Sequence, residues 1–338
     1  MIRLWNKQQV VGQFLKRIGI RGGGEYMKSY QSMINRLSGI LSEDSLPYED
    51  SIIIGDNSSG KSDILKILIQ SDEVEKYYFI DAVNRYFNVN QIINRSEPEI
   101  IYSKEINVHR IDEDNFNRKD SFYYRGVPRA IEDFFVNYSV ELTELMCEFL
   151  QQKFEIKYGD YGWEVYIDGE SVALSSGYQA LLRIFIEVVY FEKTKGTGTI
   201  VIDEIDEFLS VKNCGEVLNF LREQFKGIHF IVTTHSADLI ANVENANLIL
   251  LQGNSFQILD AGDFSSISQV YNIFDVILRV EEKKSEKEKI DDKLRMLLNN
   301  KMSGIWKKED EELFENVKNE NLTKVQKLIM RQIEEWKL

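Results

Sequence analysis

The residues best suited to chemistry lie in one glycine-rich segment, Gly55, Asp56, Asn57, Ser58, Ser59, Gly60, Lys61 and Ser62. The segment matches the pattern G-x-x-x-x-G-K-[ST] at every fixed position. Its glycines allow a tight turn and a close approach of the backbone to a ligand. Backbone N–H groups that point inward, and the start of the following helix, then favour phosphate groups. Lys61 would reach the β- and γ-phosphates of a nucleotide, and the Ser62 hydroxyl would bind Mg²⁺.

The segments on either side of this loop support the same interpretation. Residues 51–54 predict a short buried strand, and residues 63–70 predict a helix rich in Ile and Leu. The alternative is an ordinary glycine turn before a helix. We prefer a phosphate loop because the strand, the loop and the helix all agree with that motif.

Two further strands are predicted to end in polar residues. The strand over residues 199–202 is followed by Asp203 and Glu204. In this Walker B arrangement Asp203 would hold Mg²⁺, and Glu204 would take a proton from the attacking water. The strand over residues 228–234 is followed by His235, whose imidazole could donate a hydrogen bond to a γ-phosphate. A purely structural histidine is the alternative for His235.

A second anion-binding segment is predicted where Leu174, Ser175, Ser176 and Gly177 precede a strongly apolar helix over residues 180–191. Ser175 suits the N-cap of that helix, and small residues leave its first N–H groups accessible. Ser-Gly before a helix is common, so this segment supports an anion-binding site only in combination with the other motifs.

Two other groups of residues are open to more than one interpretation. Asp81, Asn84 and Arg85 follow a predicted strand over residues 77–81 and could sense Mg²⁺ or phosphate, or could form a plain loop. Residues 107–129 mix basic and aromatic side chains and could contact DNA or RNA, or could form a solvated loop beside a helix. Those side chains are His109, Arg110, Arg118, Lys119, Phe122, Tyr123, Tyr124, Arg125 and Arg129.

The pattern as a whole predicts an α/β fold with a mostly parallel core sheet. Helices are predicted over residues 5–18, 26–41 and 130–154, with a break at residues 21–24. Antiparallel hairpins are predicted over residues 154–167 and 247–259. We expect a head over residues 1–280, interrupted by a helical insertion over about residues 86–155, and a helical C-terminal tail over residues 281–338.

The composition limits the classes of function. The 338 residues carry a net charge of −14, so nucleic-acid binding is not the default expectation. The sequence has no long apolar run and no apolar segment typical of a signal peptide, so we expect a cytoplasmic protein without membrane contact. Cys147 and Cys214 are predicted to be buried free thiols.

Taken together, the motifs resemble those of the ATP-binding-cassette (ABC) ATPases, in the order of phosphate loop, Ser-Ser-Gly signature, Walker B and switch histidine. Within this superfamily, residues 50–260 are most similar to the soluble RecF/SMC/OLD branch. The resemblance implies a P-loop NTPase head of which two copies close head to tail around ATP. Ser175, Ser176 and Gly177 of one head would then bind the nucleotide held by the other, although Ser176 stands where the family has glycine. Gln91 is a late candidate for the family's Q-loop glutamine.

The function that we expect is therefore Mg²⁺-dependent ATP binding and hydrolysis that drives formation of a homodimer or a higher homo-oligomer. By the same resemblance, the ATPase would gate a separate effector protein, a nuclease or a toxin, in bacterial antiviral defence. Strands typical of a Toprim nuclease domain are not predicted after residue 281. The alternatives are a RecF-like DNA-repair ATPase that binds DNA, and an assembly module held together by ATP without hydrolysis.

Overall fold

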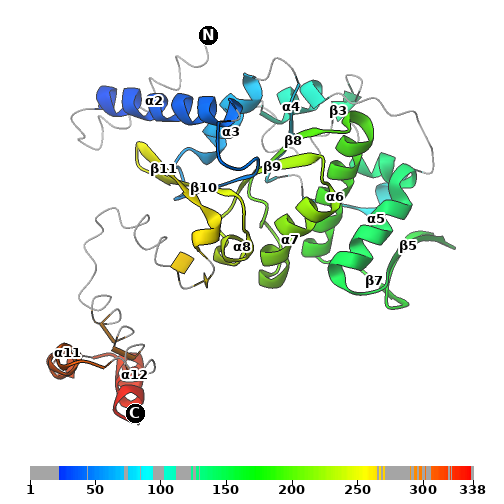
Figure 1. Cartoon of the computed structure of the whole chain (residues 1–338). Helices are drawn as coiled ribbons and strands as arrows, with labels where there is room; N and C mark the ends of the chain where they lie inside the picture. The colour runs from blue at the N-terminus through cyan, green and yellow to red at the C-terminus, as the bar shows by residue number, and fades with distance from the viewer. Residues whose placement is uncertain are drawn as a thin grey trace. The chain divides into compact units, whose positions relative to one another are not determined.

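The computed structural model describes residues 23–43, 45–71, 75–83, 85–93, 103–111, 123–124, 127–128, 130–264, 266–267 and 269–270, and parts of 290–335 (Figure 1). The chain divides into two compact units, Met1–Leu278 and Arg279–Leu338. The helix predicted over residues 5–18 lies outside the described residues. The same holds for most of residues 107–129 and 268–300.

A six-stranded sheet forms the centre of the first unit, with the strand order β11-β10-β1-β9-β8-β2. All neighbouring strands are parallel except β10 and β11, which form the predicted antiparallel hairpin. The predicted α/β class and the mostly parallel sheet are therefore confirmed. The strands are β1 (Ser51–Gly55), β2 (Tyr77–Ile80), β8 (Gly198–Ile202), β9 (Ile228–Thr233), β10 (Asn247–Gln252) and β11 (Ser255–Asp260).

Helices cover both faces of this sheet, and alternate residues of each strand face opposite sides. On one face, α2 (Gly23–Ser42) and α3 (Lys61–Gln70) pack on the sheet (Figure 1). On the other face lie α5 (Phe135–Leu150), α6 (Ser176–Lys195), α7 (Val211–Gln224) and α8 (Ala237–Asn242). Within β1, for example, Ile53 faces the first group of helices, and Ile52 and Ile54 face the second.

The predicted break at residues 21–24 is wrong in its position, because α2 already begins at Gly23. The helix exists because Met33, Ile34, Leu37 and Leu41 form one apolar stripe that is buried against α3 and the sheet. Packing of that stripe outweighs the low helix propensity of the glycines in the first turn.

The insertion consists of both helical and extended segments. It includes η1 (Val89–Gln91), α4 (Ser103–Ile111), η2 (Ile131–Phe134) and a short pairing of β3 (Tyr123–Tyr124) with β4 (Val127–Pro128). The helix predicted to reach residue 154 ends at Leu150, where Gln151 adopts a left-handed conformation. The predicted hairpin is confirmed and extended to a three-stranded antiparallel sheet of β5 (Phe154–Gly159), β6 (Gly162–Ile167) and β7 (Glu170–Val172).

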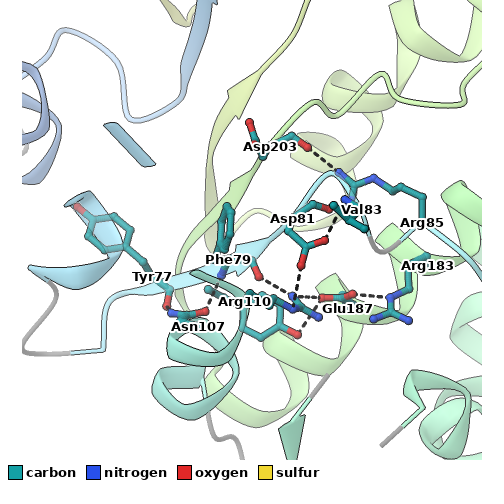
Figure 2. A network of polar contacts seen from close by, with 11 residues as sticks. Tyr77, Phe79, Asp81, Val83, Arg85, Asn107, Arg110, Arg183, Glu187 and Asp203 are labelled. Atoms are coloured by element: carbon teal, nitrogen blue, oxygen red, sulfur yellow. Dashed lines mark hydrogen bonds and ion pairs between the residues drawn. The ribbon is translucent and has the colours of Figure 1, made fainter. Parts of the chain in front are cut away.

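Side chains of α4 occupy the edge of the central sheet beside β2. Asn107 accepts a hydrogen bond from the N–H of Phe79 at 2.9 Å and donates one to the carbonyl of Tyr77 at 2.8 Å. Arg110 donates to the carbonyl of Phe79 at 2.5 Å (Figure 2). An edge strand exposes backbone N–H and C=O groups that could pair with another chain. Here side chains of α4 form hydrogen bonds with those groups of β2, in place of a further strand.

Arg110 also belongs to a cluster of buried charges that joins the insertion to α6. Its Nη1 donates to Glu187 Oε2 at 2.7 Å, and Arg183 Nε donates to Glu187 Oε1 at 2.6 Å (Figure 2). Burial alone would raise the pKa of Glu187, but the two arginines outweigh it and hold that pKa below its ordinary value. Arg110 is therefore a structural residue of the core, which argues against its predicted alternative as a nucleic-acid contact.

Glu187→Ala should lower the free energy of unfolding by about 3–5 kcal/mol, because it leaves two buried arginines without their shared carboxylate. Urea unfolding of the full chain measures this loss. Glu216→Ala, on the exposed side of α7, is the control and should change stability by less than about 0.5 kcal/mol. Since the pKa of Glu187 is lowered on folding, its contribution persists above its unfolded pKa and disappears as the pH falls through its folded pKa. Equal stability of the two variants would contradict this account.

The second unit has its own small apolar cluster. Among its described helices are α11 (Lys308–Lys318) and α12 (Lys324–Glu335). Phe314 and Val317 of α11 pack with Met330 and Ile333 of α12, together with residues of the segment 290–298. The described residues of this unit thus form helices with an apolar cluster of their own.

Candidate nucleotide site

Four parallel strands end at one edge of the sheet and bring the predicted motifs together. The phosphate loop follows β1, Asp203 and Glu204 follow β8, His235 closely follows β9, and Asp81 follows β2. Because these strands are neighbours in the order β1-β9-β8-β2, residues distant in sequence meet at this edge. The structure therefore brings these candidate residues together at the carboxyl ends of neighbouring strands.

The phosphate loop has the backbone that its glycines predict. Gly60 has a φ of 101° and begins α3 without a side-chain cap, which leaves the first N–H groups of the helix open to an anion. A Cβ on Gly55 would lie 2.5 Å from Ser59 Oγ, so only glycine fits there. Ser59 Oγ is buried and has no hydrogen-bond partner in the structure. A buried hydroxyl without a partner in such a cradle fits a site for a phosphate group.

The helix α2 packs against the phosphate loop and the start of α3. Tyr30 donates a hydrogen bond to Asp63 Oδ2 at 2.7 Å. A Cβ at Gly60 would lie 2.7 Å from both Tyr30 and Ile34. The sequence predicted α2 as a helix but gave no sign that it packs on the phosphate loop, because this contact joins residues far apart in the chain.

Lys61 is buried at the loop, with 7% of its surface exposed. Its Nζ donates to the carbonyls of Gly55 at 2.9 Å and Asp56 at 3.2 Å. Burial lowers the pKa of Lys61, while the charges of nearby carboxylates, Glu204 and Asp203 first among them, act in the opposite direction. The ammonium group is thus held at the place where a phosphate would bind.

Ser62 and Asp203 face each other across the end of the sheet. Ser62 Oγ donates to Asp203 Oδ2 at 3.0 Å, and Thr233 Oγ1 donates to Asp203 Oδ1 at 2.6 Å. A hydroxyl and a carboxylate are oxygen ligands of the kind that Mg²⁺ prefers. Among the described residues, no group of three or more His, Cys, Asp or Glu could hold a metal ion alone. A magnesium ion here would therefore take its other ligands from phosphate and water.

Glu204 and His235 lie next to this pair. Burial raises the pKa of Glu204, and the charge of Asp203 adds to the effect. A carboxylate with a raised pKa is a stronger base. His235 Nε2 lies 3.9 Å from Glu204 Oε1, which is too long for a hydrogen bond. Burial, together with the charge of Lys61, lowers the pKa of His235, so its imidazole is neutral at neutral pH.

The signature segment begins α6, as predicted. Ser175 is the N-cap, and its hydroxyl accepts a hydrogen bond from the N–H of Tyr178 at 3.3 Å. Ser175 and Ser176 are exposed. A Cβ on Gly177 would lie 3.1 Å from the carbonyl oxygen of Phe208, so the segment packs beside the turn that follows Glu204. Its exposed helix start is available to a ligand from outside the chain.

The structure describes most of the remaining candidates. Asp81 accepts a hydrogen bond from the N–H of Val83 at 3.0 Å, and Arg85 is buried and bonds to backbone carbonyls, so neither pattern suits a phosphate sensor. Asn84 lies outside the described residues. Gln91 is an exposed residue of η1. Cys147 and Cys214 are free thiols as predicted, although Cys147 is only half-buried.

The strand order decides the class of fold. The phosphate-loop strand β1 and the Walker B strand β8 flank β9, the strand that leads to His235. The Ser-Ser-Gly segment begins the buried helix α6, before β8. The fold is that of a P-loop NTPase head, as predicted. Its motifs stand in the order of the ABC-type ATPases of the SMC/RecF/OLD-like kind, which the sequence resembles.

One curated relative is similar to part of this chain. The Retron Ec83 probable ATPase from Escherichia coli is 35% identical over 94 residues. That match covers 27% of this chain and 17% of the relative, so the chain spans only a small part of the relative's length. No protein-family model matches the sequence.

Solved structures of similar heads match in part. An SMC ATPase is 18% identical, and the match covers 45% of this chain and 99% of that chain, with a TM-score of 0.32. A metal-chelate type ABC transporter is 16% identical, over 68% of this chain and 79% of that chain, with a TM-score of 0.35. The fold assignment rests on the strand order above rather than on these low scores. None of the helices in the described part of the chain is long and apolar enough to span a bilayer.

Proposed function

We propose that the head binds ATP with Mg²⁺ and hydrolyses it. The observation that carries the proposal is the pair Ser62 and Asp203, 3.0 Å apart at the end of the phosphate loop. This pair supplies a hydroxyl and a carboxylate beside Lys61, which is the arrangement that phosphoryl transfer requires for a nucleotide and its metal ion.

The residues of this chain then have distinct tasks. The N–H groups of the loop and the ammonium of Lys61 bind the phosphates, and Ser62 and Asp203 hold the metal ion, which offsets the charge of the phosphates. Glu204 accepts a proton from the attacking water, for which its raised pKa suits it. His235, as a neutral imidazole, is able to donate a hydrogen bond to the γ-phosphate.

We further propose that hydrolysis needs two copies of the head. Ser175, Ser176 and Gly177 lie beside Phe208 and present an exposed helix start. In a head-to-tail dimer this start would bind the γ-phosphate held by the other copy. ATP would then favour the closed dimer because it contacts both copies only in that state.

The closed dimer would act as a switch for a separate effector protein, a nuclease or a toxin. The Escherichia coli relative is a probable ATPase of a retron, which supports a setting in bacterial antiviral defence. DNA remains a second candidate partner, although the core position of Arg110 and the net charge of −14 give it little support.

Lys61→Ala should weaken ATP binding by about tenfold to a hundredfold, because it removes a charge-assisted hydrogen bond to phosphate. Steady-state phosphate release by the wild type tests hydrolysis, and equilibrium binding of a fluorescent ATP analogue tests the loop. Lys66→Ala, one turn further along α3, is the control and should bind as the wild type does. Wild-type affinity in the Lys61 variant would refute the phosphate loop. Tight binding without any phosphate release would instead favour the assembly module held together by ATP.

A further inference from the structure

The peptide bond between Asp203 and Glu204 is held on both sides by side chains from other parts of the sheet. On one side, the N–H of Glu204 donates to Thr233 Oγ1 at 2.6 Å. On the other side, the carbonyl of Asp203 accepts a hydrogen bond from Arg85 Nη2 at 2.9 Å (Figure 2). The Thr233 hydroxyl also donates to Asp203 Oδ1. One hydroxyl group thus holds both residues, because it donates to the side chain of Asp203 and accepts from the N–H of Glu204.

This peptide bond precedes a strained residue. Glu204 has a φ of 51°, a left-handed conformation that costs a non-glycine residue about 1–2 kcal/mol. Such a conformation persists where the surrounding contacts enforce it, and it is often found at functional sites. The two hydrogen bonds fix the plane of the preceding peptide, and thereby the direction in which the Glu204 side chain leaves the backbone.

Arg85 is almost fully buried although its side chain carries a charge. Only 2% of its surface is exposed. Its Nη1 donates to the carbonyl of Asp81 at 2.6 Å and its Nη2 to that of Asp203, while Nε has no hydrogen-bond partner. Burying a guanidinium group costs several kcal/mol. Burial lowers the pKa of Arg85, and the charges of nearby carboxylates, Asp81 first among them, act in the opposite direction, while its hydrogen bonds go to two neutral carbonyls. The guanidinium group thereby links the ends of two strands.

We propose that Arg85 and Thr233 are positioning residues, which aim the Glu204 carboxylate at the attacking water. This inference rests on the proposed hydrolysis of ATP. Arg85 joins the end of β2 to the end of β8, and Thr233 joins the end of β9 to the end of β8. Three neighbouring strands thus set the position of one carboxylate, and neither positioning residue has to touch the nucleotide.

Arg85→Gln and Thr233→Val should each lower kcat about tenfold to a hundredfold with little change in the KM for ATP, because a small misplacement of a catalytic group costs that much. Thr233→Ser keeps the hydroxyl and should restore most of the activity. Arg222→Gln is the control. Arg222 donates to the backbone carbonyls of Glu244 and Asn245 and forms an ion pair with Asp50, all at the other end of the sheet, so its loss should leave kcat unchanged.

A double-mutant cycle separates positioning from general damage. If Arg85 acts through Glu204, adding Arg85→Gln to Glu204→Gln should reduce the residual activity by less than about twofold. Arg85→Gln is the cleaner variant because it leaves both hydroxyl donors of the Asp203 carboxylate in place. A loss in the Glu204→Gln background as large as that in the wild type would overturn the positioning role.

Amide hydrogen exchange gives a readout that does not depend on turnover. Exchange of the Glu204 amide, followed by mass spectrometry of peptides that span residues 202–205, should be faster in Thr233→Val and Arg85→Gln than in the wild type and in Arg222→Gln. Wild-type exchange and wild-type kcat in both variants would overturn the inference while the ATPase assignment stands. A wild-type chain that releases no phosphate would overturn the proposed function itself.

Discussion

Glu204→Gln should reduce ATP hydrolysis by about a hundredfold to ten-thousandfold, the usual contribution of a general base, while ATP binding persists. Glutamine keeps the size of the side chain but has no carboxylate to accept a proton. The proposed metal ligands Ser62 and Asp203, which lie 3.0 Å apart in the wild type, are not altered by the change. Because ATP is then bound but not consumed, the closed dimer should accumulate.

Size-exclusion chromatography with ATP and Mg²⁺ measures this accumulation, and the variant should elute as a larger species than the wild type under the same conditions. Glu207→Gln is the matched control, since it removes a charge in the same turn and leaves the carboxylate of Glu204 in place. Full turnover by the Glu204 variant would refute the role of this carboxylate, and equal losses in both variants would point to the charge of the turn instead.

Local patterns predicted the strand ends correctly, since each motif depends on only a few adjacent residues. The phosphate loop is fixed by two glycines and the helix after them, and the signature by the N-cap Ser175. Parallel pairing of β1, β9, β8 and β2 then brings these local features to one edge. A parallel sheet thus converts short sequence patterns into a three-dimensional site.

Contacts that join distant segments could not be predicted in this way. Arg110 was one basic residue in a stretch that could also have contacted nucleic acid, and only the carboxylate of Glu187, far along the chain, shows that it is buried. The bonds of Arg85 and Thr233 to the peptide before Glu204 have no local signal either. A left-handed glutamate is not evident from sequence, because only glycine or asparagine would suggest that conformation.

Gly177→Arg should abolish hydrolysis and leave ATP binding intact, because we propose that the signature acts on the nucleotide of the other copy. The phosphate loop, Asp203 and His235 meet at one edge of the sheet, whereas Gly177 lies beside Phe208 at an exposed helix start. An arginine there would cover the helix start and keep it from the γ-phosphate of the other copy, without touching the loop of its own head. Gly177→Ala is the control, since its Cβ adds the local contact with Phe208 but no long side chain, and it should retain more activity.

Mixing the Gly177→Arg and Lys61→Ala proteins tests the composite site directly. In a mixed dimer the first protein supplies an intact loop and the second an intact signature, so one of the two sites is rebuilt. At equal amounts half of the dimers are mixed, and about a quarter of the wild-type activity should return if one intact site is enough. The specific activity of the wild type should also rise with protein concentration until dimers saturate. A specific activity that is independent of concentration, with no recovery on mixing, would show that each head holds a complete site.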